Sequence, residues 1–520
     1  MQIRTFAVVA LAICCTSSAL AQERVDEATL ARIRMEGFQH SQVMDTLSWL
    51  TDVHGPRLHN SPQLQKAGEW ARDQLTRWGL QRAALEPYTH PGRGWVMDRF
   101  SVEMTAPQYM RVIAYPKAWS PAIAGTLAGT PVIVDVKSKA DFERYKGKLK
   151  GAIVMNGRPS RTEIGFEPEA TRLTPEDLAK QAKQQDVAPA GFDGRPQGYW
   201  EDEEEFDAAI QKAVDVWKFF ASEGVAAVIT PSRISEDVSV DGFYDEIWKP
   251  TYPGFVFSRE HYGRIMRMLD KQQPVTLTLS LATHFIDQVQ PFNVVAEIPG
   301  TDPALASEVV LIGGHLDSWH SGTGATDNGA GSAAVMEAMR ILKTLDLKPR
   351  RTIRMALWSG EEEDYFGSMG YVEQHFADVK TMALKPEHAT LAAYFNLDNG
   401  AGRIRGVNLQ GNEMVRPIFE AWMKPFGYLG ATTLTSMNTG GTDHMVFDAV
   451  GLPGFQFIQD PLNYETKVHH SNLDVYEQVI PDDLEQASVV LAGFAWQAAQ
   501  RDEKLPRKPL PAPHVATPKK

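Results

Sequence analysis

Six acidic and imidazole side chains occur in phrases that end an apolar segment or that are rich in glycine. Imidazole nitrogens and carboxylate oxygens bind divalent metal ions, and the set contains no sulfur, so it suits zinc, with manganese and cobalt as alternatives. One carboxylate would remain to act as a base. The pattern therefore predicts a hydrolase with a metal centre. The six residues are His315, Asp327, Glu361, Glu362, Asp398 and His470.

The first two of these residues flank a glycine-rich stretch. His315 follows the apolar segment 309–312, which predicts that it lies at the carboxyl end of a buried strand. Asp317 could hold the second ring nitrogen of this histidine and so fix its tautomer. Asp327 precedes a predicted helix and could bridge two cations. Each residue also has an ordinary interpretation, because a turn histidine can bond to the backbone and Asp often caps a helix.

Three consecutive glutamates, residues 361–363, follow the apolar segment 353–358. Adjacent carboxylates repel one another at a sheet edge unless cations neutralise them. Neighbouring side chains there point in different directions, so one could bind a metal while the next faces a metal-bound water. A solvated acidic loop is the alternative.

The metal-centre prediction depends on the combination, because each phrase alone is weak. His315, residues 361–362 and Asp398 follow three successive predicted strands, and strand ends of one sheet share an edge. Together with Asp327 and His470 they could hold two metal ions that share a carboxylate.

These phrases resemble peptidase family M28, a family of zinc exopeptidases, and within it the carboxypeptidase Q-like branch. The resemblance covers about residues 290–480. The phrase at 54–58 also looks similar to the family, and the segment between the two parts resembles a protease-associated (PA) domain. The matching motifs are Gly314-His315-Leu316-Asp317, Thr326-Asp327-Asn328-Gly329, Glu361-Glu362, Asp398, and His470 with Asp474 four residues later.

The resemblance implies two Zn²⁺ ions per chain. His315 and Asp398 would bind one ion. Glu362 and His470 would bind the other, and Asp327 would bridge the two.

The resemblance also implies roles in the reaction. Glu361 would be the general base, and His469 would lie near the oxyanion as a candidate stabiliser. Glu363 receives no role. His444 could line the substrate pocket or belong to the core.

The implied substrates are peptides, cleaved at a terminal bond. Family precedent favours an aminopeptidase, whereas a carboxypeptidase or dipeptidase would need a basic group for the substrate carboxylate, for which Arg403 and Arg405 are candidates. Surplus acids near Glu363 and Asp364 could instead bind a free amine. A non-catalytic peptide-binding relative is a further alternative.

The elements that must position these residues alternate between strands and helices from residue 292 onward. This alternation predicts an α/β fold with a mostly parallel or mixed sheet and helices on both faces, the zinc exopeptidase fold, plus an inserted β-rich domain. The expected strands are 309–312, 353–358, 391–397 and 455–458, and the expected helices are 329–342, 368–376 and 481–500.

The chain divides into five expected segments. A signal peptide occupies residues 1–21, and a discontinuous peptidase domain comprises 22–118 and 285–504. The PA-like domain spans 119–284, and a disordered tail rich in Pro and Lys spans 505–520.

The signal peptide is predicted from Arg4, the apolar run 6–15 and the small residues before Gln22. A lipoprotein signal ending at Cys14 or Cys15 is the alternative. Because both cysteines lie in this segment, the mature chain has none and forms no disulfide. We expect an exported protein, periplasmic or secreted.

The net charge of −13 and the lack of a basic stripe argue against nucleic acid as a partner. No later segment is long and apolar enough to span a membrane. The oligomeric state stays open, and a homodimer is compatible with the sequence.

Overall fold

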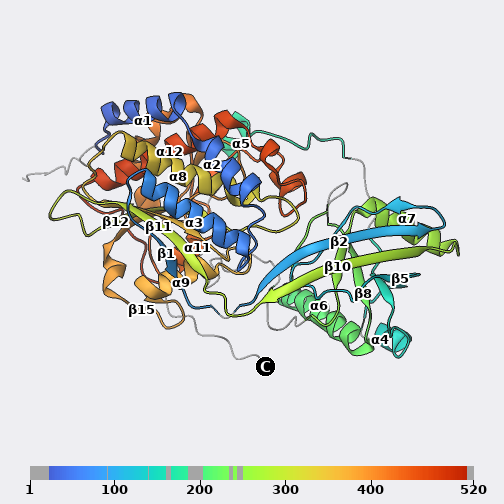
Figure 1. The fold of residues 1–520 in the computed structure, drawn as a ribbon. Coiled ribbons are helices and arrows are strands. Elements are labelled where there is room, and N and C mark those ends of the chain that lie inside the picture. Colours follow the sequence, from blue (N-terminus) through green and yellow to red (C-terminus); the bar gives the residue numbers. More distant parts are fainter. Residues whose placement is uncertain are drawn as a thin grey trace, which may run out of the picture.

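Eight strands form one mixed sheet through the larger of two lobes in the computed structural model (Figure 1). The structure describes residues 23–90, 92–138, 140–159, 165–184, 203–233, 238–242 and 250–511, so the expected signal peptide at 1–21 lies outside the described residues. In order across the sheet, the strands are β1 (Gln81–Pro87), β11 (Phe292–Ile298), β13 (Thr352–Trp358), β12 (Val309–His315), β16 (Leu391–Asn396), β19 (Gly454–Gln459), β17 (Ile404–Asn408) and β18 (Thr433–Thr435).

The centre of this sheet is parallel. Strands β13, β12, β16 and β19 run in the same direction, whereas β11 is antiparallel to β13 and β17 is antiparallel to β19. The carboxyl ends of the four central strands therefore lie at one edge, where ligands of such sheets bind.

Helices cover both faces of the sheet. Alternate side chains of the buried strands pack into two separate apolar cores, one on each face. The larger core lies beneath α1 (Glu27–Gln39), α2 (Val43–Ser48), α3 (Pro62–Arg77), α8 (Ala330–Thr344), α10 (Arg416–Met423) and α12 (Pro481–Gln500), and the smaller beneath α9 (Phe366–His375) and α11 (His444–Ala449).

Local sequence explains where these helices begin. The Ser61 hydroxyl accepts a hydrogen bond from the Leu64 amide, and Pro62 occupies the first turn of α3, where its missing N–H costs nothing. Helices α8 and α12 are buried on nearly all sides because they pack against each other as well as against the sheet.

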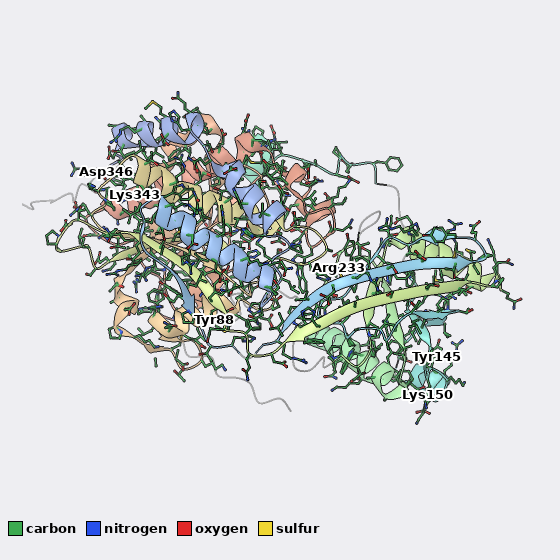
Figure 2. The ribbon with its side chains drawn as sticks, viewed as in Figure 1. Tyr88, Tyr145, Lys150, Arg233, Lys343 and Asp346 are labelled. Atoms are coloured by element: carbon green, nitrogen blue, oxygen red, sulfur yellow. The ribbon has the colours of Figure 1, made fainter. Side chains whose placement is uncertain are left out.

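The second lobe contains two further sheets. Their strand orders are β3-β2-β10-β5 and β4-β9-β8-β7-β6, and Arg233 lies on the side of this lobe that faces the larger one (Figure 2). The strands are β2 (Gly94–Ala106), β3 (Met110–Arg111), β4 (Ala114–Pro116), β5 (Leu127–Gly129), β6 (Val132–Val134), β7 (Ile153–Asn156), β8 (Ala227–Pro231), β9 (Gly254–Phe257) and β10 (Thr276–Ile286), and the helices are α4 (Ala140–Tyr145), α6 (Glu203–Glu223) and α7 (Arg259–Asp270).

The α/β class with helices on both faces is confirmed, and α12 begins and ends where the sequence predicts. The second lobe is larger than the expected 119–284, because β2 precedes that range and pairs along β10. Conversely α5 (Pro175–Gln181), which lies within the range, packs against the larger lobe near β18 (Figure 1). The identity of this lobe as a PA domain stays a prediction.

The start of the expected disordered tail needs correction. Leu505 is buried, Arg507 donates hydrogen bonds to the carbonyls of His388 and Leu391, and Lys508 forms an ion pair with Asp448. Residues 505–511 are therefore packed against the larger lobe, and 512–520 lie outside the described residues. No helix in the described part of the chain is long and apolar enough to cross a membrane.

Candidate metal centre

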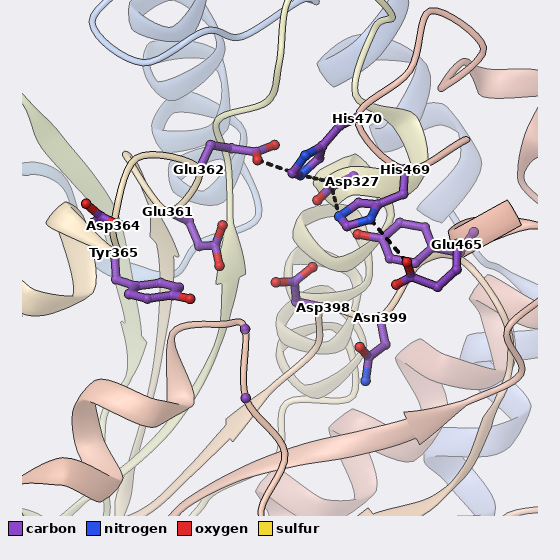
Figure 3. Close-up of a pocket in the computed structure, with 13 residues that line it drawn as sticks. Asp327, Glu361, Glu362, Asp364, Tyr365, Asp398, Asn399, Glu465, His469 and His470 are labelled. Atoms are coloured by element: carbon purple, nitrogen blue, oxygen red, sulfur yellow. Dashed lines mark ion pairs between the residues drawn. The ribbon is translucent and has the colours of Figure 1, made fainter. Parts of the chain in front are cut away.

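The predicted site residues lie together at the carboxyl edge of the central strands. Figure 3 shows Asp327, Glu361, Glu362, Asp398, His469 and His470 around one pocket. His315 is the last residue of β12 and is fully buried. Glu361 and Glu362 follow β13 after a turn at Gly360, whose φ of +76° favours glycine. Asp398 follows β16 by two residues.

One group of ligand atoms gathers around His315. Its Nε2 lies 3.1 Å from Asp327 Oδ1 and 3.4 Å from Asp398 Oδ1. Ligand atoms of these three residues all lie within 4.8 Å of one another, so they could hold one ion.

A second group gathers on the other oxygen of Asp327. His470 Nε2 lies 3.2 Å from Asp327 Oδ2 and 3.0 Å from Glu362 Oε2. His469 Nε2 lies 3.6 Å from the same Asp327 oxygen, and the two histidines and Asp327 together could hold an ion. His469, which we expected near the oxyanion, is therefore also a potential ligand.

The donor set fits divalent cations. Asp327 Oδ2 and Glu362 Oε1 are buried and make no hydrogen bond among the described residues, although a buried carboxylate normally has partners. Nitrogen and oxygen donors without sulfur are ligands that zinc accepts. A bound cation would satisfy both oxygens.

The proton affinities show how strongly the acids and histidines interact. Burial raises the pKa of Glu362 to about 7, assisted by Asp327. Burial would also raise the pKa of Asp327, but its close contacts with His315 and His470 lower that pKa well below the usual range. Burial lowers the pKa of His470, but Glu362 and Asp327 outweigh this and raise it to about 10. A bound divalent cation would instead favour the deprotonated form of His470, because it binds the neutral imidazole.

Two further aspartates hold the ligand loops. The Asp317 carboxylate accepts hydrogen bonds at 3.4 Å from the amides of both Glu361 and Glu362. Its backbone carbonyl is the closer partner of His315 Nδ1, at 3.1 Å, whereas its carboxylate lies 3.7 Å away. Asp474 accepts a hydrogen bond of 3.1 Å from the Asp327 amide and thereby fixes that residue's backbone.

Arg57 is a residue of the site that sequence reasoning missed. It is fully buried and donates to four carbonyls, those of Leu50, Leu316, Thr323 and Gly324. These bonds join the two ends of the loop between β12 and Asp327 to each other and to Leu50. Burial lowers the pKa of Arg57 to about 10, against the opposing effect of Asp474 and Asp317, so it remains a cation at neutral pH.

Glu363 contacts a buried histidine. Its Oε2 lies 3.3 Å from His59 Nδ1, and both side chains are buried. His59 Nε2 in turn contacts the Tyr88 hydroxyl at 3.1 Å, which donates to the Ser359 carbonyl. This contact was not predicted, since only the family-like phrase before His59 drew attention to that part of the chain.

A cavity of about 290 Å³ opens over the two ligand groups. His444 does not line it, because this histidine is buried and its Nε2 bonds to the Thr439 carbonyl. The lining residues are Asp327, Glu361, Glu362, Asp364, Tyr365, Asp398, Asn399, Gly440, Gly441, Tyr464, Glu465, His469 and His470.

Comparisons with known proteins find a family match and similar chains. Residues 293–495 match the model of peptidase family M28. Carboxypeptidase Q from Mus musculus is 27% identical over 92% of this chain and 90% of its own length. The crystal structure of a peptidase M28 precursor from Shewanella amazonensis has a TM-score of 0.68 and 26% identity, covering 93% of this chain and 98% of its own. A zinc aminopeptidase from Bacillus subtilis has a TM-score of 0.56 and 18% identity, covering 88% and 95%, and shows the fold alone.

Proposed function

Because the chain belongs to peptidase family M28 and is a metallopeptidase, we propose that it is an exopeptidase with two zinc ions and an aminopeptidase specificity. The observation that supports two ions is the position of Asp327. Its Oδ1 faces His315 and its Oδ2 faces His470, so one carboxylate belongs to both ligand groups. His315 and Asp398 would hold one ion, and Glu362 and His470 the other.

The zinc ions, when bound, would lower the pKa of a water molecule and polarise the substrate carbonyl. Glu361 is the proposed base because it lines the cavity and is only partly exposed. It takes the proton of the attacking water and returns it to the leaving amine. Burial, with Asp398 and Asp443, raises the pKa of Glu361 well above its usual value and so favours proton uptake.

The charge of the cavity supports recognition of a free amine. Asp364 and Glu465 line it in addition to the proposed metal ligands, and its described lining contains no lysine or arginine. Arg403 and Arg405, the candidates for binding a substrate carboxylate, instead pair with Asp483 and Asp460. A substrate ammonium group in this cavity would therefore meet carboxylates.

A second candidate is a carboxypeptidase or dipeptidase, favoured by the similarity to carboxypeptidase Q. Three versions of one short peptide distinguish them: unblocked, N-acetylated and C-amidated. An aminopeptidase cleaves the unblocked and C-amidated peptides and spares the acetylated one. Cleavage of the acetylated peptide with loss of the amidated one would overturn the assignment, and cleavage of the unblocked peptide alone would indicate a dipeptidase.

We further propose export through the signal peptide at residues 1–21, followed by release in soluble form. N-terminal sequencing of the exported protein should then begin at Gln22. A mature chain that retains Met1 would contradict this proposal.

A further inference from the structure

The two neighbouring histidines of the site lie on one loop, residues 460–472, here called the histidine loop. His470 has a φ of +55°, a left-handed conformation that is uncommon for residues other than glycine. His469 and His470 are partly exposed, at 34% and 25% of the side chain, so the core alone does not fix them. The loop must be held by other contacts.

The first end of the histidine loop is bound by residues 171–173, which belong to the segment inserted between β2 and β10. The Arg172 guanidinium donates to Asp460 Oδ2 at 2.8 Å and to Asp483 Oδ2 at 2.7 Å. The Leu173 amide donates to Asp460 Oδ1 at 3.0 Å. The Thr171 amide donates to the Leu462 carbonyl at 2.9 Å. Both aspartate side chains are fully buried and the Arg172 side chain is 40% exposed, so charge-assisted bonds join a surface residue to two buried carboxylates.

The other end is bound by residues 238–240, which belong to the same insertion. The Val240 amide donates to the carbonyl of His470 itself at 2.9 Å, and the Asn472 amide donates to the Val238 carbonyl at 3.2 Å. The Asn472 side chain accepts a bond of 2.7 Å from the Val238 amide. This short antiparallel pairing fixes the backbone that carries His470.

We propose that the insertion holds the histidine loop at both ends and that Arg172 is a positioning residue for the zinc site that includes His470. The inference rests on the proposed function, in which this loop supplies the second ion's ligand. Contacts that orient metal ligands typically change metal affinity by about 10- to 100-fold when removed. Loosening the loop should therefore weaken one zinc site and spare the one around His315.

Arg172→Ala is a mild test of this role. Asp460 keeps Arg405 and Asp483 keeps Arg403 as partners, so no buried carboxylate is left unpaired. Arg158→Ala is the matched control, since Arg158 forms a comparable two-bond ion pair with Asp270 inside the second lobe, without contact to the histidine loop.

The first measurement is hydrogen exchange of the full-length, metal-free proteins, which does not depend on zinc stoichiometry. Amides of residues 460–472 should exchange faster in R172A than in wild type or R158A. Equal exchange in all three would overturn the inference.

The second measurement is zinc titration of the same proteins. R172A should bind one of the two ions about tenfold less tightly, with the affinity for the other ion unchanged. Two unaltered sites would contradict the role of Arg172. A wild-type protein with a single site would instead contradict the proposed function, and the exchange data would still decide whether the insertion holds the loop.

Discussion

Two glutamates that are adjacent in the sequence have different surroundings, and this difference divides their roles. Glu362 lies 3.0 Å from His470, as expected of residues that share an ion. Glu361 lines the same cavity, and its pKa is raised by burial and by the acids Asp398 and Asp443. A metal ligand must be deprotonated, whereas a general base must be able to accept a proton. The surroundings of Glu362 therefore suit a ligand, and those of Glu361 suit a base.

Glu361→Gln should reduce kcat by at least about 100-fold, because the amide cannot accept the proton of the attacking water. Zinc content should stay at the wild-type value. Peptide hydrolysis and metal analysis of the same preparation check both statements. Glu362→Gln is the contrasting variant and should lose zinc. Near-normal turnover by E361Q would show that another group is the base.

Single residues also show where sequence reasoning reaches its limit. His315, Asp327 and Asp398 were predictable because each follows a strand or precedes a helix that its own segment specifies. Arg57 was not, because its role consists of bonds to carbonyls more than 250 residues away in sequence as well as to nearby Leu50. No local pattern encodes such contacts.

At the scale of elements, β12, β13 and α12 were predictable because long apolar or periodic segments specify them. Strands β17 and β18 were missed because they are short and carry polar residues. Their place in the sheet is fixed by pairing with β19 and with each other, which is tertiary information.

A histidine joins three elements of the larger lobe and predicts a pH dependence. At the end of α9, His375 contacts Glu86 of β1 at 2.7 Å and Glu387 at 3.0 Å. Burial lowers the pKa of His375, but the two glutamates outweigh burial and raise it above 6.5. The stabilisation of the fold by protonated His375 is therefore fully present below pH 6.5. It is lost as the pH rises through the folded-state pKa of His375.

His375→Gln should thus lower the free energy of unfolding more at pH 5.5 than at pH 8.5. Denaturant unfolding of the variant and the wild type at the two pH values measures this difference. An equal loss at both values, or a larger loss at pH 8.5, would mean that the charged imidazole does not stabilise these contacts.

At the scale of the whole molecule, the proposed metal centre lies in the larger lobe and the loop that carries His470 contacts the inserted segment. The larger lobe supplies every proposed ligand, while segments 171–173 and 238–240 of the insertion bind the loop that carries His470. The sequence predicted an insertion. The contacts of residues 171–173 and 238–240 with the histidine loop were not predictable, because they pair segments that are distant in the sequence. Removal of zinc should therefore loosen both the proposed metal centre and the contacts of the insertion with the histidine loop.

Zinc bound only by the folded state should stabilise it, by about 2.7 kcal/mol per site at a free zinc concentration one hundred times Kd. Chelation should lower the melting temperature and abolish hydrolysis, and added zinc should restore both. A melting temperature that is unchanged by chelation would contradict a role of the ions in holding these loops.

The most direct measurement is the zinc content of the purified full-length protein and of Asp327→Ala, determined by elemental analysis per chain. If Asp327 is shared by two ions, wild type contains two zinc ions per chain and D327A contains at most one. A wild-type protein with one zinc ion or none, or a D327A variant that retains two, would contradict the shared-carboxylate centre.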